Sequence, residues 1–213
     1  MTATQAPTRP ATTINRSTTT RALLTCGAVA APLWAAVSLA QAATRAGFDL
    51  TRHPLSLLST GDLGWLQILN FVIAGLLTVL GASGLARALS SVWAPRLIRV
   101  NGIAMIAAGV FTMSPGNGFP LGAGPGVLTW HDLGHMAAGS IAFISLIATC
   151  YVLARSYSRA GRRAHAVLSL VAGTALLVGD LWAMSGGPAG SLTLAIGAIT
   201  AMAWVSTVAA ESR

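Results

Sequence analysis

The sequence has 213 residues, of which 54% are hydrophobic and only 8% are charged, with a net charge of +8. Because a soluble domain carries roughly a quarter charged residues, this chain has too few to cover a globular surface in water. The composition therefore predicts an all-α membrane protein whose surface contacts the lipid bilayer. The positive charge does not indicate nucleic-acid binding, since the arginines are scattered over short segments and no aromatic platform accompanies them.

Residues 1–20 are rich in Thr, Ala and Pro and predict a disordered tail. The rest of the chain, 21–213, predicts one transmembrane domain. Its six apolar stretches are each close to the ~20 residues with which a helix spans a bilayer, and they lie near 22–43, 65–86, 97–113, 133–154, 165–184 and 191–210. Since spanning backbone must satisfy its own hydrogen bonds, we expect a bundle of six transmembrane helices.

The arginines predict the orientation of this bundle. If six spans alternate, eleven of the thirteen arginines fall on one side, and only Arg45 and Arg52 fall on the other. The positive-inside rule then makes the first side, with both termini, cytoplasmic. This predicts a multi-pass protein of the cell membrane whose arginines face anionic lipid headgroups. An alternative leaves five spans: the first stretch, which ends in Ala40-Gln41-Ala42, is then a cleaved signal peptide.

Polar side chains gather on the predicted outer side, which holds four of the five acidic residues and three of the four histidines. We expect an outward-facing polar pocket near the outer ends of the second, fourth and fifth spans. Its candidate residues are His53, Ser56, Ser59, Asp62, Asn70, His131, Asp132, His135 and Asp180. The fourth histidine, His165, follows two arginines in a predicted cytoplasmic loop and is assigned no role.

Asp180 is the most informative of these residues, because it lies about four residues from the outer end of the fifth stretch. A carboxylate at that depth is costly unless it faces the bundle interior and finds a partner there. The alternative is that its side chain reaches the lipid headgroups beside Trp182.

His131 and His135 are four residues apart, so a helix places both on one face. Two such imidazoles can hold a metal ion, shuttle protons or pack against neighbouring helices. Zinc would need a third ligand, which His53, Asp62, Asp132 or Asp180 could supply. Haem ligation would instead need His53, because two ligands on one helix face cannot clamp an iron from opposite sides. This pattern establishes no cofactor.

The stretch from Phe48 to Phe71 resembles an actinobacterial branch of the six-span membrane family known as domain of unknown function 998. Gly109-Val110-Phe111, Gly118-Phe119-Pro120 and Trp130-His131 with His135 continue the match. The resemblance implies a six-helix fold and brings no established activity.

Two departures from the pattern of this family concern a metal site. An acidic Asp-Pro pair often follows the Phe of the third span, but here 112–115 contains no acid. His-Gly usually begins the fourth span, whereas this chain has His131-Asp132. The first departure weakens a metal site, and the second offers a replacement carboxylate.

Four functions remain open. The first is a transporter, channel or lipid-handling protein whose outer pocket binds a small molecule, a lipid or protons. The second is a metal-dependent membrane hydrolase using His131, His135 and Asp180 with Ser56 or Ser59, by analogy with seven-span zinc amidases. The third is a haem-bearing redox protein, and the fourth a structural partner without a ligand. Convergence of His53, His131 and His135 with Asp180 would favour a site, and their dispersion would favour the structural role.

Overall fold

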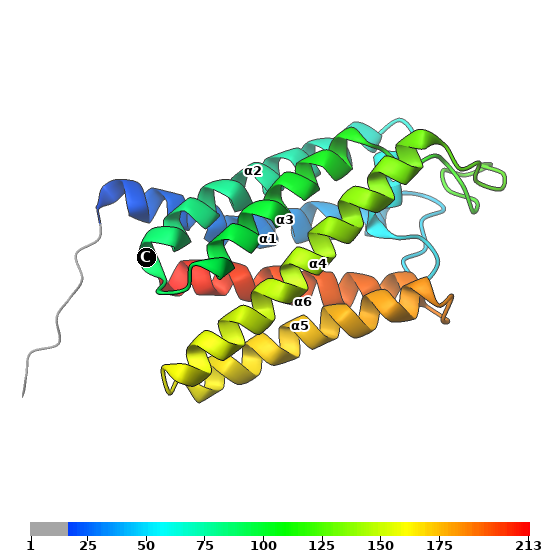
Figure 1. Cartoon of the computed structure of the whole chain (residues 1–213). Helices are drawn as coiled ribbons and strands as arrows, with labels where there is room; N and C mark the ends of the chain where they lie inside the picture. Colours follow the sequence, from blue (N-terminus) through cyan, green and yellow to red (C-terminus); the bar gives the residue numbers. More distant parts are fainter. Residues whose placement is uncertain (1–16) are drawn as a thin grey trace, which may run out of the picture.

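The computed structural model describes residues 17–213, and most of them are helical (Figure 1). The elements are α1 (Thr18–Thr44), the short 3₁₀ helix η1 (Leu55–Ser59), α2 (Gly64–Ala88), α3 (Trp93–Val110), α4 (Trp130–Arg159), α5 (Arg163–Met184) and α6 (Gly190–Glu211). Each predicted apolar stretch corresponds to one α-helix. The helix α1 begins inside the predicted tail, because Thr18 to Thr20 are helical, and residues 1–16 lie outside the described part.

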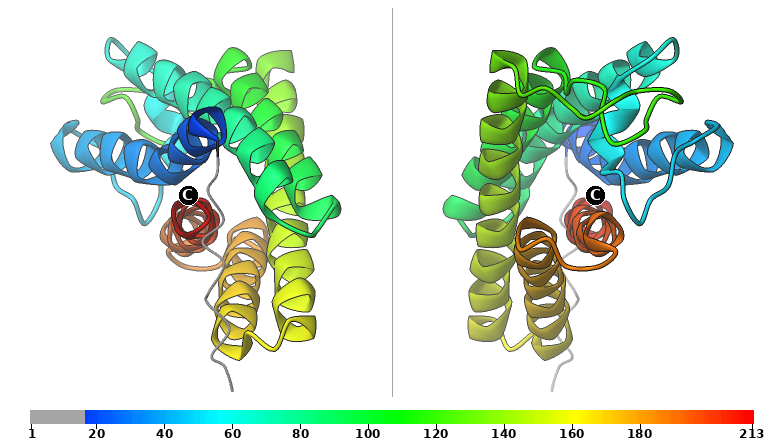
Figure 2. Two further views of the ribbon diagram at one scale, coloured as in Figure 1. Left: turned by 90° about the vertical axis from the view of Figure 1, so that its left-hand side faces the viewer. Right: turned by 90° about the vertical axis from the view of Figure 1, so that its right-hand side faces the viewer.

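The six α-helices pack in a closed ring (Figure 2). Each contacts the next helix along the chain, and α1 contacts α6 to complete the ring. The helices α1 and α2 cross at Gly27 and Gly81, where a Cβ on Gly81 would collide with the backbone of Gly27. Only glycine permits this approach. Ser206 of α6 donates a hydrogen bond to the carbonyl of Gly27 (2.8 Å), so α1 forms an integral wall of the ring.

Five of the α-helices are long and apolar enough to cross a membrane. The exception in the described chain is α3, which corresponds to the predicted span near 97–113. It has 18 residues and carries Arg96 and Arg99 in its first two turns, which lowers its mean hydropathy. Large hydrophobic side chains such as Leu76, Ile144 and Ile196 are exposed on the outer faces of the ring, as expected for helices surrounded by hydrocarbon.

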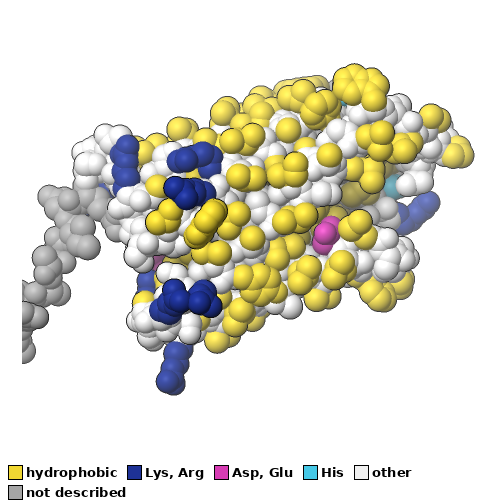
Figure 3. Space-filling view, in the orientation of Figure 1, with side chains coloured by type: hydrophobic (Ala, Val, Ile, Leu, Met, Phe, Trp, Pro, Cys, Tyr) yellow, Lys and Arg dark blue, Asp and Glu magenta, His cyan; other side chains and the backbone are white. Residues whose placement is uncertain are grey.

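The two ends of the bundle differ in chemistry. The described N-terminus, the C-terminus and the α2–α3 and α4–α5 connections share one end (Figure 1), where basic side chains gather on the face drawn in Figure 3. We call this the basic end (residues 17–21, 87–99, 155–165 and 211–213). The opposite end, called the loop end, comprises residues 45–63, 111–129 and 185–189. All nine candidate site residues lie at or near the loop end, whereas His165 lies at the basic end.

Candidate functional site

His53 joins the two long connections of the loop end. Its Nδ1 atom accepts a hydrogen bond from the backbone N–H of Asp49 (3.0 Å). Its Nε2 atom donates to the carbonyl of Asn117 (3.0 Å) in the α3–α4 connection. Both ring nitrogens are therefore occupied, and His53 has no lone pair to offer a zinc ion or a haem iron.

A tight turn presents that carbonyl. Asn117 and Gly118 both have positive φ (56° and 87°), as the two central residues of a type I′ turn require. The flanking Gly116 and Phe119 exchange two backbone hydrogen bonds of 3.0 Å. Phe119 is 1% exposed, and its ring packs against those of His53 and Phe48. The Gly- and Pro-rich α3–α4 connection is thus anchored to the α1–α2 connection.

Asp132 caps α4 and fixes the start of that helix. Its carboxylate accepts hydrogen bonds from the backbone N–H and hydroxyl of Thr129 and from those of Ser114. The Thr129 hydroxyl in turn accepts from the Asp132 backbone N–H, which completes a capping box. With four donors already on the carboxylate, Asp132 acts as a structural clamp rather than as the replacement metal ligand that the sequence offered.

The two histidines of α4 face different surroundings. The His131 ring lies against Trp130 (3.7 Å between centroids) and near Phe111. In contrast, the Nδ1–H group of His135 donates to the carbonyls of Ala108 (2.9 Å) and Phe111 (2.8 Å). These carbonyls belong to the end of α3, where helical backbone lacks intrahelical partners. His135 therefore caps α3, and its Nε2 atom has no hydrogen-bond partner among the described residues.

Asn70 lies between α1 and α2 instead of in a pocket. Its side-chain nitrogen donates to the carbonyl of Trp34 (3.0 Å) and to the hydroxyl of Ser38 (3.1 Å). Gln67 joins the same network, since its Oε1 atom accepts from Gln41 (2.9 Å) and its Nε2 atom donates to Ser38 (3.0 Å). All these polar side chains are buried. We call Ser38, Gln41, Gln67 and Asn70 the interhelical network; it is a packing feature.

Two further candidates of the loop end serve local structure or face solvent. The Ser59 hydroxyl donates to the carbonyl of Ser56 (2.8 Å). Asp62 is exposed. The guanidinium of Arg45 instead holds η1 by donating to the carbonyls of Leu58 (2.5 Å) and Thr60 (2.6 Å). Neither Ser59 nor Asp62 lines the central cavity described below.

A cavity of about 260 Å³ in the centre of the ring brings together the three remaining candidates, Ser56, His135 and Asp180. All six α-helices and η1 contribute to its wall. The sequence has six methionines, and all except Met1 line this cavity: Met105, Met113, Met136, Met184 and Met202. Sequence reasoning missed them because they are spread over four helices and a loop. Methionine is flexible and polarizable, and it is common at binding surfaces that adapt to varied ligands.

The polar groups of the cavity are few. Ser56 donates its hydroxyl to the Sδ atom of Met113 (3.1 Å), and Asn101 donates to the carbonyl of Ala142 (3.0 Å). Asp180 is half-buried, and it makes no hydrogen bond or ion pair with another described residue. Residues 17–213 contain no group of three or more His, Cys, Asp and Glu side chains placed to hold a metal ion. The zinc hypothesis therefore lacks a three-ligand set in the described chain.

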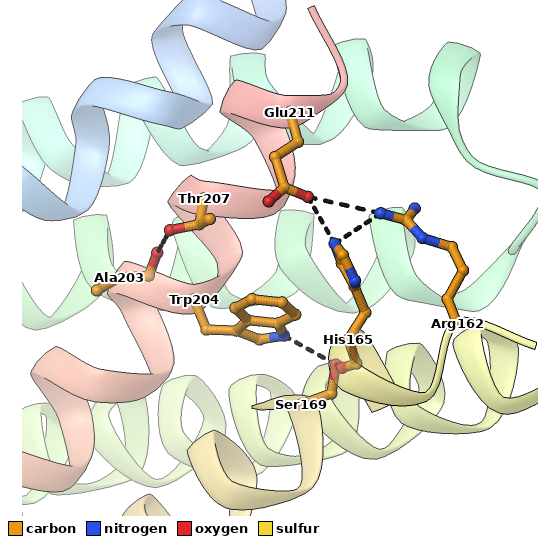
Figure 4. A network of polar contacts seen from close by, with 7 residues as sticks. All are labelled: Arg162, His165, Ser169, Ala203, Trp204, Thr207 and Glu211. Carbon is orange, nitrogen blue, oxygen red and sulfur yellow. Dashed lines mark hydrogen bonds and ion pairs between the residues drawn. The ribbon is translucent and has the colours of Figure 1, made fainter. Parts of the chain in front are cut away.

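His165 lies in the first turn of α5 and not in a solvated loop as predicted (Figure 4). Its ring packs near Tyr157 and Trp204, with centroids 5.1 and 5.8 Å away. Its Nε2 atom lies 2.6 Å from a nitrogen of Arg162 and 2.9 Å from an oxygen of Glu211. The atom accepts from Arg162 in one tautomer and donates to Glu211 in the other. This cluster ties the α4–α5 turn to the end of α6 at the basic end.

These features define a membrane-type helical protein with a largely apolar central cavity. The chain belongs to the family described as protein of unknown function (DUF998), whose model matches residues 28–211. The match confirms the resemblance seen in the sequence and covers all six α-helices from within α1 to the last residue of α6. No curated protein and no solved structure matches the chain.

Proposed function

We propose that this protein is a six-span protein of the cell membrane, with cytoplasmic termini, that binds an apolar or amphipathic small molecule in its central cavity. The positive-inside rule supports the orientation, because the arginine-rich basic end also holds both described chain ends. The position of α3 supports a sixth span: although less apolar, it packs between α2 and α4 within the ring. The loop end then faces outward.

The composition of the cavity wall is the observation that carries the proposal. Ligand sites in proteins are mostly apolar cavities with a few polar groups that orient the ligand. Here five methionines and the aromatic rings of Trp34, Phe71 and Phe143 supply the apolar wall. The indole nitrogen of Trp34, His135 and Asp180 supply polar atoms without a hydrogen-bond partner in the described chain. Neither the carboxylate of Asp180 nor the Nε2 atom of His135 has a hydrogen-bond partner among the described residues, so both are available to a ligand.

Binding explains the cavity better than hydrolysis does. A zinc hydrolase would need His131 and His135 to bind one ion. However, the His131 ring stacks on Trp130, and the Nδ1–H group of His135 donates hydrogen bonds to carbonyls of α3. A purely structural role leaves the cavity itself without an explanation, because helix bundles normally fill their interiors to high density.

Photolabelling of the purified full-length protein in nanodiscs tests this proposal. The probe is a long-chain alcohol carrying a diazirine, which inserts into whatever residue lies beside it. We expect labelling of cavity residues such as Met105 and Met202 to saturate with probe concentration, whereas labelling of the lipid-facing Ile144 rises without saturation.

A pair of α4 variants controls the experiment. Gly139 lines the cavity, and a Cβ there would meet no atom within 4 Å, so Gly139→Trp can place an indole in the cavity without a backbone clash. It should abolish saturable labelling, whereas Ala137→Trp, at an exposed position outside the cavity wall, should not. Equal, non-saturating labelling of cavity and lipid-facing residues would overturn the proposal.

A further inference from the structure

The cavity opens sideways, between α4 and α5. These helices meet at the basic end and diverge toward the loop end (Figure 1). Where they diverge, the residues that line the cavity are also exposed: Met136 is 56% exposed and Met184 is 77% exposed. On the far side of the cavity the wall is closed, since Trp34 and Phe71 are both buried. Figure 3 shows the α4–α5 face as hydrophobic around one acidic side chain.

Most polar side chains of the cavity lie at its loop end, although Asn101, Ser140 and the indole nitrogen of Trp34 lie deeper. Ser56, His135, Asp180 and Ser191 belong to the loop-end turns of their elements. Met105, Leu146 and Met202 line the part nearer the basic end, where the Asn101 side chain donates its hydrogen bond to a backbone carbonyl. Along α6, the wall runs from Ser191 to Met202, which is about 16 Å at 1.5 Å per residue. The cavity is therefore elongated and amphipathic, with its polar part near the proposed outer surface.

Asp180 gives the polar part of the cavity a negative charge. It is the one charged side chain in the described wall of the cavity, and no described residue donates to it. It lies four residues before the end of α5, or about 6 Å below the end of the helix. An isolated carboxylate at such a depth is costly, and a cation beside it removes most of that cost. The wall contains no Arg or Lys that could supply the cation.

We propose that the cavity takes a single-chain amphiphile with a cationic amine head, which enters from the outer leaflet between α4 and α5. This inference rests on the proposed ligand-binding function and specifies its ligand class. The ammonium group pairs with Asp180, and the Nε2 lone pair of His135 offers a second acceptor. The chain extends along the part of the cavity lined by Met105, Leu146 and Met202.

The size of the cavity sets the number of chains. A cavity of roughly 150 Å³ admits one benzene molecule, so about 260 Å³ accommodates one alkyl chain and not the two chains of a phospholipid. A free alkylamine and a lysolipid with an ethanolamine headgroup both offer the required chemistry, which is a single chain joined to an ammonium.

Three diazirine probes with the same alkyl chain test the proposal in nanodiscs: a primary amine, an alcohol and a carboxylate. The amine should half-saturate cavity labelling at a concentration roughly tenfold or more below that of the alcohol, as a charge-assisted hydrogen bond implies. The carboxylate should bind more weakly than the alcohol. Asp180→Asn should abolish the preference for the amine over the alcohol, and Asp180→Glu should restore it.

A matched acid controls for surface charge. Asp49 lies at the loop end outside the cavity wall, and the Thr51 hydroxyl and backbone N–H donate to it and hold its pKa below the usual range. Asp49→Asn should therefore leave the preference for the amine intact. Displacement of the amine probe by lysophosphatidylethanolamine would identify a lipid source, and displacement by dodecylamine alone a free amphiphile; either result supports the shared chemistry.

The two proposals fail in different ways. If all three probes saturate cavity labelling at the same concentration, or if Asp180→Asn does not change the preference, the amine proposal is overturned and the binding function stands. If no probe saturates, and Gly139→Trp has no effect on any of them, the binding function itself is overturned.

Discussion

The interface of α1 with α2 and the central cavity both contain polar side chains, but the two regions treat them differently. In the interhelical network, Gln67 exchanges hydrogen bonds with Ser38 and Gln41, and Asn70 also reaches a backbone carbonyl. Asp180 and His135 line the cavity, and neither the carboxylate nor the Nε2 atom of His135 has a hydrogen-bond partner in the described chain. The amide donors of the network hold the two helices together, although the Oε1 atom of Gln41 and the Oδ1 atom of Asn70 have no partner. The polar groups beside the cavity do not join helices and are available to a ligand.

The largest effect that tests this contrast is expected from Gln67→Leu. The change removes the oxygen that accepts from Gln41 and the nitrogen that donates to Ser38. The side chains of Gln41 and Ser38 then stay buried in a poorly hydrated interface with fewer hydrogen-bond partners. We expect the free energy of unfolding to fall by roughly 2 kcal/mol, measured by tryptophan fluorescence during denaturation in detergent micelles.

The neighbouring Leu69 is a control for this substitution, because it is exposed on the outer face of α2. Leu69→Ala should change stability by less than about 0.5 kcal/mol. A Gln67→Leu protein as stable as the Leu69→Ala protein would show that the network contributes nothing and would remove one side of the contrast.

The fold was more accessible from the sequence than the site. The length of each apolar run fixed all six helices, because hydrocarbon thickness sets how many residues a span needs. The helix α3 was the hardest to classify, since Arg96 and Arg99 lie within its 18 residues. Asp180 is the one acid inside a predicted apolar stretch, and its depth there was the reason to expect it at the bundle interior; in the structure it lines the cavity.

The remaining site residues could not be separated by sequence. His53 and Asp132 resemble ligands, yet their partners are backbone groups of distant loops, such as the Asn117 carbonyl and the Ser114 N–H. The methionines gave no signal for a different reason. Because lipid tails are as apolar as a protein core, hydrophobic periodicity does not tell which face of a spanning helix turns inward.

An intermediate effect is expected at the cap of α4. Asp132→Ala removes the acceptor of two backbone N–H groups, those of Thr129 and Ser114. The loss of a helix cap typically costs about 1 kcal/mol, and the free energy of unfolding should fall by that amount. Asp132→Asn, which keeps one side-chain acceptor, should recover part of the loss. Equal stability of Asp132→Ala and the unaltered protein would contradict the assignment of this carboxylate to structure.

The smallest effect on stability is expected from Asp180→Asn, although this substitution should have the largest effect on ligand preference. The carboxylate of Asp180 accepts no hydrogen bond from a described residue, so Asp180→Asn removes no hydrogen bond. The substitution also removes the cost of holding an isolated charge at this depth. The free energy of unfolding without ligand should therefore stay within about 0.5 kcal/mol of the original value or rise. The same denaturation measurement, made after exhaustive detergent washing, checks this. A fall of more than about 1 kcal/mol would mean that Asp180 has a partner within the protein, because only a lost interaction destabilises a fold by that much. Asp180 would then belong with the paired groups of the interhelical network.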